Sequence, residues 1–218
     1  PSSSHTVGPM RAARRFVFEL PAADFARTTR VSVELHGSLA HTGRGHNTDT
    51  AMMLGLSGEL PDEIDIARVP IIVADIKARH QLSLLGQRDI AFTPATDIIF
   101  NLRDLLPVHS NGMTFRAFEN DALIAERIMY SVGGGFVVDE DEVFVGAPRG
   151  DERAPPFAFN TMRALLLMAE REHKRVVELL RANEFALRSK AETNDFLDRV
   201  IATMFACIDR GLNTEGML

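Results

Sequence analysis

Residues 1–10 place three serines, a histidine and a threonine directly before an apolar, periodic run. In that run apolar residues recur every three or four positions: Met10, Ala13, Phe16, Val17 and Leu20. This spacing predicts an amphipathic helix with one buried face. Hydroxyl side chains ahead of such a run are N-cap candidates, and a helix N-terminus attracts anions such as carboxylates. The segment could therefore hold an anionic group, with a plain N-cap as the alternative.

A second chemically suggestive segment is Gly43-Arg44-Gly45-His46. Histidine titrates near neutral pH, so it can act as a general base, a ligand or a switch. The two glycines leave room for a substrate to approach the backbone, and Asp49 lies three residues further on, where it could orient the imidazole. The alternative interpretation is a loop histidine exposed to solvent.

Two other glycine-containing segments accompany them. Polar residues His109, Ser110 and Asn111 precede Gly112, and Gly133-Gly134-Gly135 interrupts a strand-like pattern. Glycines inside a strand usually mark a bulge or a close approach of two backbones.

Several other chemistries are not supported by the spacing of these residues. Gly43-Arg44-Gly45 lacks the glycine spacing and the Lys-Ser/Thr pair of a phosphate-binding loop. No helix clearly follows the three consecutive glycines, which argues against a dinucleotide fingerprint, and no Gly-x-Ser-x-Gly nucleophile motif occurs. His36 and His41 have no third metal ligand nearby. Cys207 falls on an apolar helix face and is predicted to be a buried small hydrophobe.

The remaining pattern predicts an α+β fold over residues 1–145. Alternation over residues 30–39 indicates a half-buried strand, and residues 48–56 and 69–85 are predicted to be helical. Short strand-like runs follow, among them residues 113–119 and 122–132, which a turn at Asn120-Asp121 could join as a hairpin.

From residue 146 to residue 156 glycine, proline and charged residues predict a linker, and residues 157–218 are predicted to be entirely helical. In the last helix, Ser189 and Glu192 have the spacing of a capping box, and Gly211 is the predicted C′ residue. Three helices make a thin core, so we expect this second domain to be truncated or to pack against something else.

The totals favour a globular, soluble protein. Of 218 residues 45% are hydrophobic, and the net charge of −6 argues against nucleic-acid binding. No apolar run approaches the ~18 residues of a membrane span. A single cysteine excludes a disulfide framework and favours a reducing, cytoplasmic location. The strands over residues 113–132 could pair across a homodimer.

Four segments, in order, carry a resemblance to a known family: residues 1–10, 37–49, 109–113 and 130–140. They resemble the motifs of the bacterial iron–sulfur L-serine dehydratases, and residues 206–216 look like the start of that family's catalytic region. The resemblance implies a lyase of amino-acid degradation and gluconeogenesis that converts L-serine to pyruvate and ammonia. It also implies a β domain of mixed or antiparallel sheet, related to an allosteric substrate-binding fold, followed by a helical α domain.

The family uses an oxygen-sensitive 4Fe-4S cluster in which one iron lacks a cysteine ligand and acts as a Lewis acid. The cluster cysteines are expected downstream of Leu218, so no metal ligand is predicted in this chain, and the chain alone is expected to be inactive. Its expected partners are L-serine, its own C-terminal α domain and a second copy of the chain.

The resemblance also implies roles for individual residues. His46 is the expected catalytic base for the α-proton. The substrate carboxylate is expected to lie in the loop formed by Ser2, Ser3, Ser4, His5 and Thr6, with weaker assignments to Thr48, Asp49 and Asn111. Serine and threonine differ by one methyl group, worth only about 1–3 kcal/mol of discrimination, so the preference between them stays open.

Two non-catalytic functions remain as alternatives. The α+β part could be a module that senses an amino acid for regulation, or a dimerisation domain. His46 in its glycine loop favours the enzyme, because a sensor has no need of a base.

Overall fold

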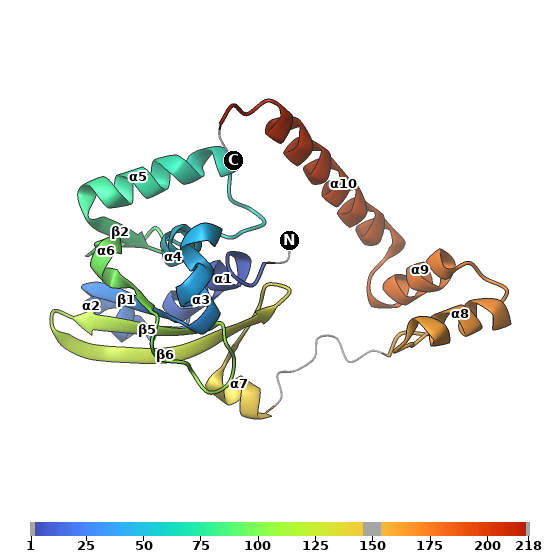
Figure 1. The fold of residues 1–218 in the computed structure, drawn as a ribbon, viewed down its shortest axis with the longest axis horizontal. Helices are drawn as coiled ribbons and strands as arrows, with labels where there is room; N and C mark the ends of the chain where they lie inside the picture. Colours follow the sequence, from blue (N-terminus) through green and yellow to red (C-terminus); the bar gives the residue numbers. More distant parts are fainter. Residues whose placement is uncertain (1–2, 146–153, 217–218) are drawn as a thin grey trace. The chain divides into compact units, whose positions relative to one another are not determined.

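A computed structural model gives the fold and describes residues 3–145 and 154–216 (Figure 1). The chain divides into two compact units, Pro1–Ala147 and Pro148–Leu218. Ser2 and most of the predicted linker, residues 146–153, lie outside the described residues.

The first unit is built on a seven-stranded mixed sheet in the order β2-β3-β1-β5-β6-β7, with β4 paired to β1. β1 runs parallel to β3 and β4 and antiparallel to β5. This sheet with its helices, followed by a helical segment, confirms the predicted fold class. The strands are β1 Arg30–His36, β2 Gln81–Leu84, β3 Arg88–Ala91, β4 Ile98–Asn101, β5 Gly112–Glu119, β6 Ala122–Gly133 and β7 Phe136–Asp139.

The core of this unit lies between the sheet and helix α1 (Val7–Phe18). Of its predicted apolar stripe, Met10, Ala13, Phe16 and Val17 are buried, whereas Leu20 lies beyond the end of the helix and is half-buried. The ring of Phe16 stacks on that of Phe115 at 5.2 Å. α1 also packs against α4 (Thr48–Leu56), where a Cβ on Gly55 would lie 2.2 Å from the Met10 carbonyl oxygen. Only glycine allows so close a contact between the two helices. The other helices of the unit are α2 Ala22–Arg27, α3 Gly37–Thr42, η1 Gly43–His46, η2 Ile66–Arg68, α5 Val69–Arg79, α6 Pro94–Asp97 and α7 Glu140–Val145.

Two predicted element ends are wrong. The strand predicted over residues 30–39 ends at His36, because Gly37 adopts φ +54° and starts α3. A Cβ at Gly37 would lie 2.4 Å from the Ser110 carbonyl oxygen, so only glycine fits this turn. The helix predicted over residues 69–85 ends at Arg79, where His80 takes a left-handed conformation before β2.

Two predicted turns are confirmed. β5 and β6 form a hairpin across Asn120, whose φ is +55°. Gly133, Gly134 and Gly135 all have positive φ and connect β6 to β7, with a register shift between Ser131 and Gly133. The glycines therefore serve a bulged turn, since side-chain-bearing residues rarely adopt these angles.

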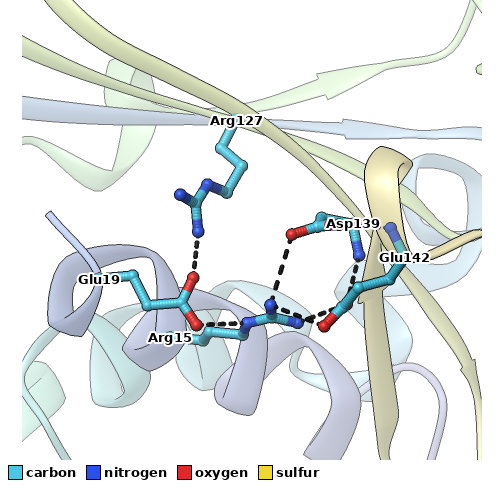
Figure 2. Close-up of polar contacts among 5 residues, drawn as sticks. All are labelled: Arg15, Glu19, Arg127, Asp139 and Glu142. Atoms are coloured by element: carbon cyan, nitrogen blue, oxygen red, sulfur yellow. Dashed lines mark hydrogen bonds and ion pairs between the residues drawn. The ribbon is translucent and has the colours of Figure 1, made fainter. Parts of the chain in front are cut away.

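A network of ion pairs connects α1 to the strands and to α7 (Figure 2). Arg15 donates to Glu19 at 2.8 Å, to Glu142 at 2.8 and 3.0 Å and to Asp139 at 3.4 Å, and Arg127 on β6 pairs with Glu19. Asp139 and Glu142 cap each other's backbone N–H at the start of α7. The hydrogen bond from Arg15 is the largest influence on Glu142 and lowers the pKa of its carboxyl group.

Replacing Arg15 with methionine should therefore destabilise the first unit by about 1 kcal/mol near pH 7. Because the Glu142 pKa is lowered in the folded state, this contribution is present above the carboxyl's unfolded pKa and disappears as the pH falls through its folded pKa. Urea unfolding near pH 7 and near pH 3, followed by the fluorescence of Tyr130, the single tyrosine, measures both values.

The matched control for this prediction is Arg79→Met. Arg79 pairs with Asp75, and both side chains are more than half exposed, so its removal should change the free energy of unfolding very little. An Arg15→Met loss of the same size at both pH values would contradict the electrostatic explanation.

The second unit consists of α8 (Met162–Arg171), α9 (Val176–Leu187) and α10 (Lys190–Leu212). The capping box at Ser189 is confirmed, since Ser189 and Glu192 each accept the other's backbone N–H. The C-cap of α10 is Asn213, so the prediction for Gly211 is wrong. No helix within the described ranges is long and apolar enough to cross a membrane.

α10 presents many apolar side chains to solvent: Phe196, Val200, Ile201, Met204, Phe205, Ile208 and Leu212. Cys207 is exposed as well, so its predicted burial is wrong.

Candidate functional site

The site begins at the turn that leads into α1. The Ser3 hydroxyl accepts the Thr6 N–H at 3.1 Å, and the Ser3 carbonyl accepts the Gly8 N–H at 3.0 Å. Pro9 has no N–H. The donors that a helix N-terminus offers to an anion are therefore largely used within this turn, and a carboxylate bound here would depend mainly on side chains.

His5 projects from this turn and is held on both sides by hydroxyl groups. Its Nδ1 lies 2.9 Å from Ser4 Oγ, and its Nε2 lies 2.9 Å from Ser38 Oγ on α3. A serine hydroxyl can donate or accept, so either neutral tautomer of His5 finds two partners.

His46 lies at the end of η1, with its ring centroid 5.0 Å from that of His5 and the two planes tilted by 51°. Burial lowers the pKa of His5, and the nearby His46 lowers it further, while the Ser38 contact acts in the opposite direction. Repulsion disfavours two positive charges on imidazoles this close together. The pair therefore accepts one extra proton more easily than two.

Two threonines join the segments that carry these histidines. Thr6, at the N-cap of α1, does not cap the helix with its side chain; its hydroxyl donates to the His46 carbonyl at 2.9 Å. Thr48, the first residue of α4, donates to the His5 carbonyl at 2.6 Å and is fully buried. These two hydrogen bonds join residues 40 and 43 positions apart in the sequence, and each segment donates one of them to the other.

The other predicted site residues occupy different positions. Asp49 follows Thr48 in the first turn of α4, and within the described chain it makes no hydrogen bond to His46. Asn111 is buried and donates from Nδ2 to the Ser131 carbonyl at 3.1 Å. Among the residues that the structure describes, its Oδ1 and the Ser131 hydroxyl are buried without a hydrogen-bond partner.

Asn111 therefore belongs to a cluster beneath the start of α1, since a Cβ on Gly8 would lie 2.0 Å from Ser131 Oγ. The His109 Nδ1 accepts the backbone N–H of Asn111 at 3.1 Å, which fixes the conformation of this loop.

Sequence reasoning missed Ser38 as a site residue. It lies within the recognisable segment 37–49, but a strand was predicted to continue through it. The positive φ of Gly37 turns the chain at this point and aligns the Ser38 hydroxyl with His5. A glycine directly before a serine, close to the end of an alternating run, was the available signal.

A cleft of about 360 Å³ lies elsewhere, against the solvent-facing side of α1 and the β6–β7 turn. Of the arginines lining it, Arg11 donates to Gly135, Arg14 donates to Gly58 and Arg15 belongs to the ion-pair network. These cations already have protein partners, so we place the candidate site at the two histidines.

The described residues do not fit an iron–sulfur cluster. Within the described ranges, no three His, Cys, Asp or Glu side chains are grouped as metal ligands would be. The single cysteine, Cys207, is exposed on α10, and a cluster requires several thiolates.

Comparison with known proteins is decisive for the family. Residues 1–142 match the model of the serine dehydratase beta chain. The chain belongs to this family. The match covers the sheet and both histidine-bearing segments described above.

Relatives match over the full chain. L-serine dehydratase 1 of Escherichia coli (strain K12) is 40% identical over 220 residues, which cover 100% of this chain and 48% of the relative. An L-serine dehydratase of Streptomyces coelicolor is 41% identical with the same coverage, and one of Haemophilus influenzae is 37% identical. The chain thus spans about half the length of the curated relatives it matches, and the resemblance noted from its motifs is confirmed.

Proposed function

We propose that this chain forms part of an L-serine dehydratase, a lyase that converts L-serine to pyruvate and ammonia. The observation that carries the proposal is the His5–His46 pair, which lies in the region matched by the serine dehydratase beta chain. The relatives are named L-serine dehydratases, which supports L-serine as the substrate.

In the proposed reaction, His46 takes the α-proton of serine. It is the more exposed imidazole of the pair, and burial together with the neighbouring His46 lowers the pKa of His5, which favours the neutral form of His5. The hydroxyls of Ser2, Ser3 and Ser4, together with His5, are proposed to bind the substrate carboxylate. Neutralising that charge makes the α-proton easier to remove.

The Cα–H bond breaks and its proton goes to the imidazole, while the Cβ–O bond breaks and the hydroxide leaves as water after gaining a proton. The resulting aminoacrylate tautomerises to an imine, whose hydrolysis consumes one water and releases ammonia and pyruvate.

A 4Fe-4S cluster is proposed as the cofactor of the assembled enzyme, where it would supply a Lewis acid for the serine hydroxyl. Since the described residues do not fit such a cluster, we propose that its cysteines come from the additional half that the relatives possess. On this proposal, residues 1–145 are the β domain, residues 157–218 begin the α domain, and the enzyme is a cytoplasmic homodimer.

The test of this function is pyruvate formation from L-serine by the assembled dehydratase, prepared without oxygen. Turnover that stops when the cluster is removed and returns when it is rebuilt is the expected result. Absence of turnover in a cluster-loaded preparation would contradict the proposal.

The alternative is a sensing module, favoured by the well-defined polar turn around His5. Calorimetry with L-serine separates the two functions. Tight binding by this chain alone, unchanged by His46→Ala, would support a sensor, whereas the enzyme predicts that productive binding needs the assembled protein.

A further inference from the structure

The two histidines are connected by more than proximity. The Thr6 hydroxyl donates to the carbonyl of His46, and the Thr48 hydroxyl donates to the carbonyl of His5. Each threonine therefore holds the backbone of the other segment's histidine. The two hydrogen bonds together fix the separation of the segments better than either alone, because a single hydrogen bond would still let one segment rotate relative to the other.

Burial argues against a direct substrate role for Thr48. Its side chain is fully buried, and its hydroxyl already donates to the His5 carbonyl. A Cβ placed on Gly43 would lie 3.0 Å from that hydroxyl, so the hydroxyl is enclosed on this side as well. A group in this position can act on the reaction only through the residues that it holds.

Ser38 orients the ring of His5 by a hydrogen bond. Its hydroxyl lies 2.9 Å from Nε2, opposite the contact of Ser4 with Nδ1, so both ring nitrogens are fixed in direction. The ring then cannot rotate away from His46 without losing two hydrogen bonds.

We propose that Thr6, Thr48 and Ser38 are positioning residues that hold His5 and His46 as a single proton-transfer pair. This inference rests on the proposed function and extends it. Thr6 and Thr48, which were expected to contact the substrate, are instead assigned to the hydrogen bonds that hold the two histidine segments together; we call the hydrogen bonds of Thr6, Thr48 and Ser38 the brace. The pair carries one extra proton at a time: His46 takes the proton removed from the substrate, and His5, whose two ring nitrogens already contact Ser4 and Ser38, stays neutral beside it.

Charged or titratable residues also lie on the three elements that supply Ser38, His46 and Thr48. His41 lies on α3, Arg44 on η1 and Asp49 on α4. The Arg44 guanidinium lies 4.4 Å from the centre of the Phe100 ring, which directs it toward that residue. After burial, the neighbouring His46 is the second cause that lowers the pKa of His5.

The first test is the NMR titration of the histidine side chains in this chain, with His5 and His46 assigned from His→Gln variants. Thr48→Val should raise the pKa of His5 toward its ordinary value, since the brace is lost and the rings separate. Thr48→Ser keeps the hydroxyl and should restore the wild-type titration. His46→Asn should raise the His5 pKa as well, because the neighbouring positive charge is removed.

The matched control is Thr28→Val. Thr28 is also fully buried and donates its hydroxyl to a backbone carbonyl, that of Asp24 at 2.7 Å, but it takes no part in the pair. It should leave the His5 titration unchanged. An unchanged His5 titration in Thr48→Val, or an equal shift in Thr28→Val, would overturn the brace.

The second test uses the assembled dehydratase. Thr48→Val should lower kcat for L-serine by about 10- to 100-fold with little change in KM, since a displacement of about 1 Å can cost that much, and Thr48→Ser should recover most of the rate. Wild-type kcat in Thr48→Val would overturn the proposal. If the wild-type enzyme forms no pyruvate, the proposed function fails, while the titration still decides whether the pair is coupled.

Discussion

Replacing His46 with alanine should lower kcat/KM for L-serine by about 10²- to 10⁴-fold in the assembled dehydratase, the usual contribution of a general base. His46 is exposed at the end of η1, within reach of a substrate, and it lies against the more buried His5. The loss should appear mainly in kcat, because binding of the carboxylate is assigned to the serines and to His5.

His41→Ala is the matched control for this prediction. His41 is an exposed histidine five positions earlier, in the last turn of α3, and is assigned no part in the reaction. It should retain close to wild-type activity. Equal losses in the two variants would show that the His46 effect is general damage to this region.

Replacing Gly55 with alanine is expected to cause the largest loss of stability. The new Cβ would lie 2.2 Å from the Met10 carbonyl oxygen and 2.8 Å from the Ala13 Cβ, so α1 and α4 would have to separate. Overpacking of this kind costs about 1–3 kcal/mol, which should exceed the gain of up to about 1 kcal/mol in helix propensity.

Gly55→Ala should also displace residues of the candidate site, because α1 follows directly after His5 and Thr6, and α4 begins at Thr48. Urea unfolding and the His5 titration should therefore both change in Gly55→Ala. The control is Gly45→Ala, where a Cβ meets no atom within 4 Å. A Gly55→Ala protein as stable as the wild type would show that the two helices can adjust without cost.

The sequence predicted those parts of the fold that depend on local patterns. The apolar stripe of α1, the Asn120 turn and the Ser189 capping box follow from spacing and from intrinsic conformational preferences, and the structure confirms all three. The ends of β1 and α5 were wrong because Gly37 and His80 take left-handed conformations. At Gly37 that choice depends on the Ser110 carbonyl, which lies far away in the sequence.

The candidate site was predictable only in part, because it too depends on contacts between residues that lie far apart in the sequence. His5 and His46 could be selected from their motifs, but nothing local indicates that Thr6 and Thr48 would bond to each other's segments. Ser38 joins the site through the turn at Gly37. The exposed apolar side of α10, including Cys207, could not be recognised from its periodicity, because an amphipathic pattern does not specify what covers it.

The most direct test of the central claim is chemical rescue of His46→Ala by free imidazole in the assembled dehydratase. If the His46 imidazole accepts the α-proton of serine, pyruvate formation by the variant should be low and should rise in proportion to added neutral imidazole, while the wild-type enzyme does not respond. Wild-type turnover by His46→Ala without imidazole, or a low rate that imidazole leaves unchanged, would contradict the account.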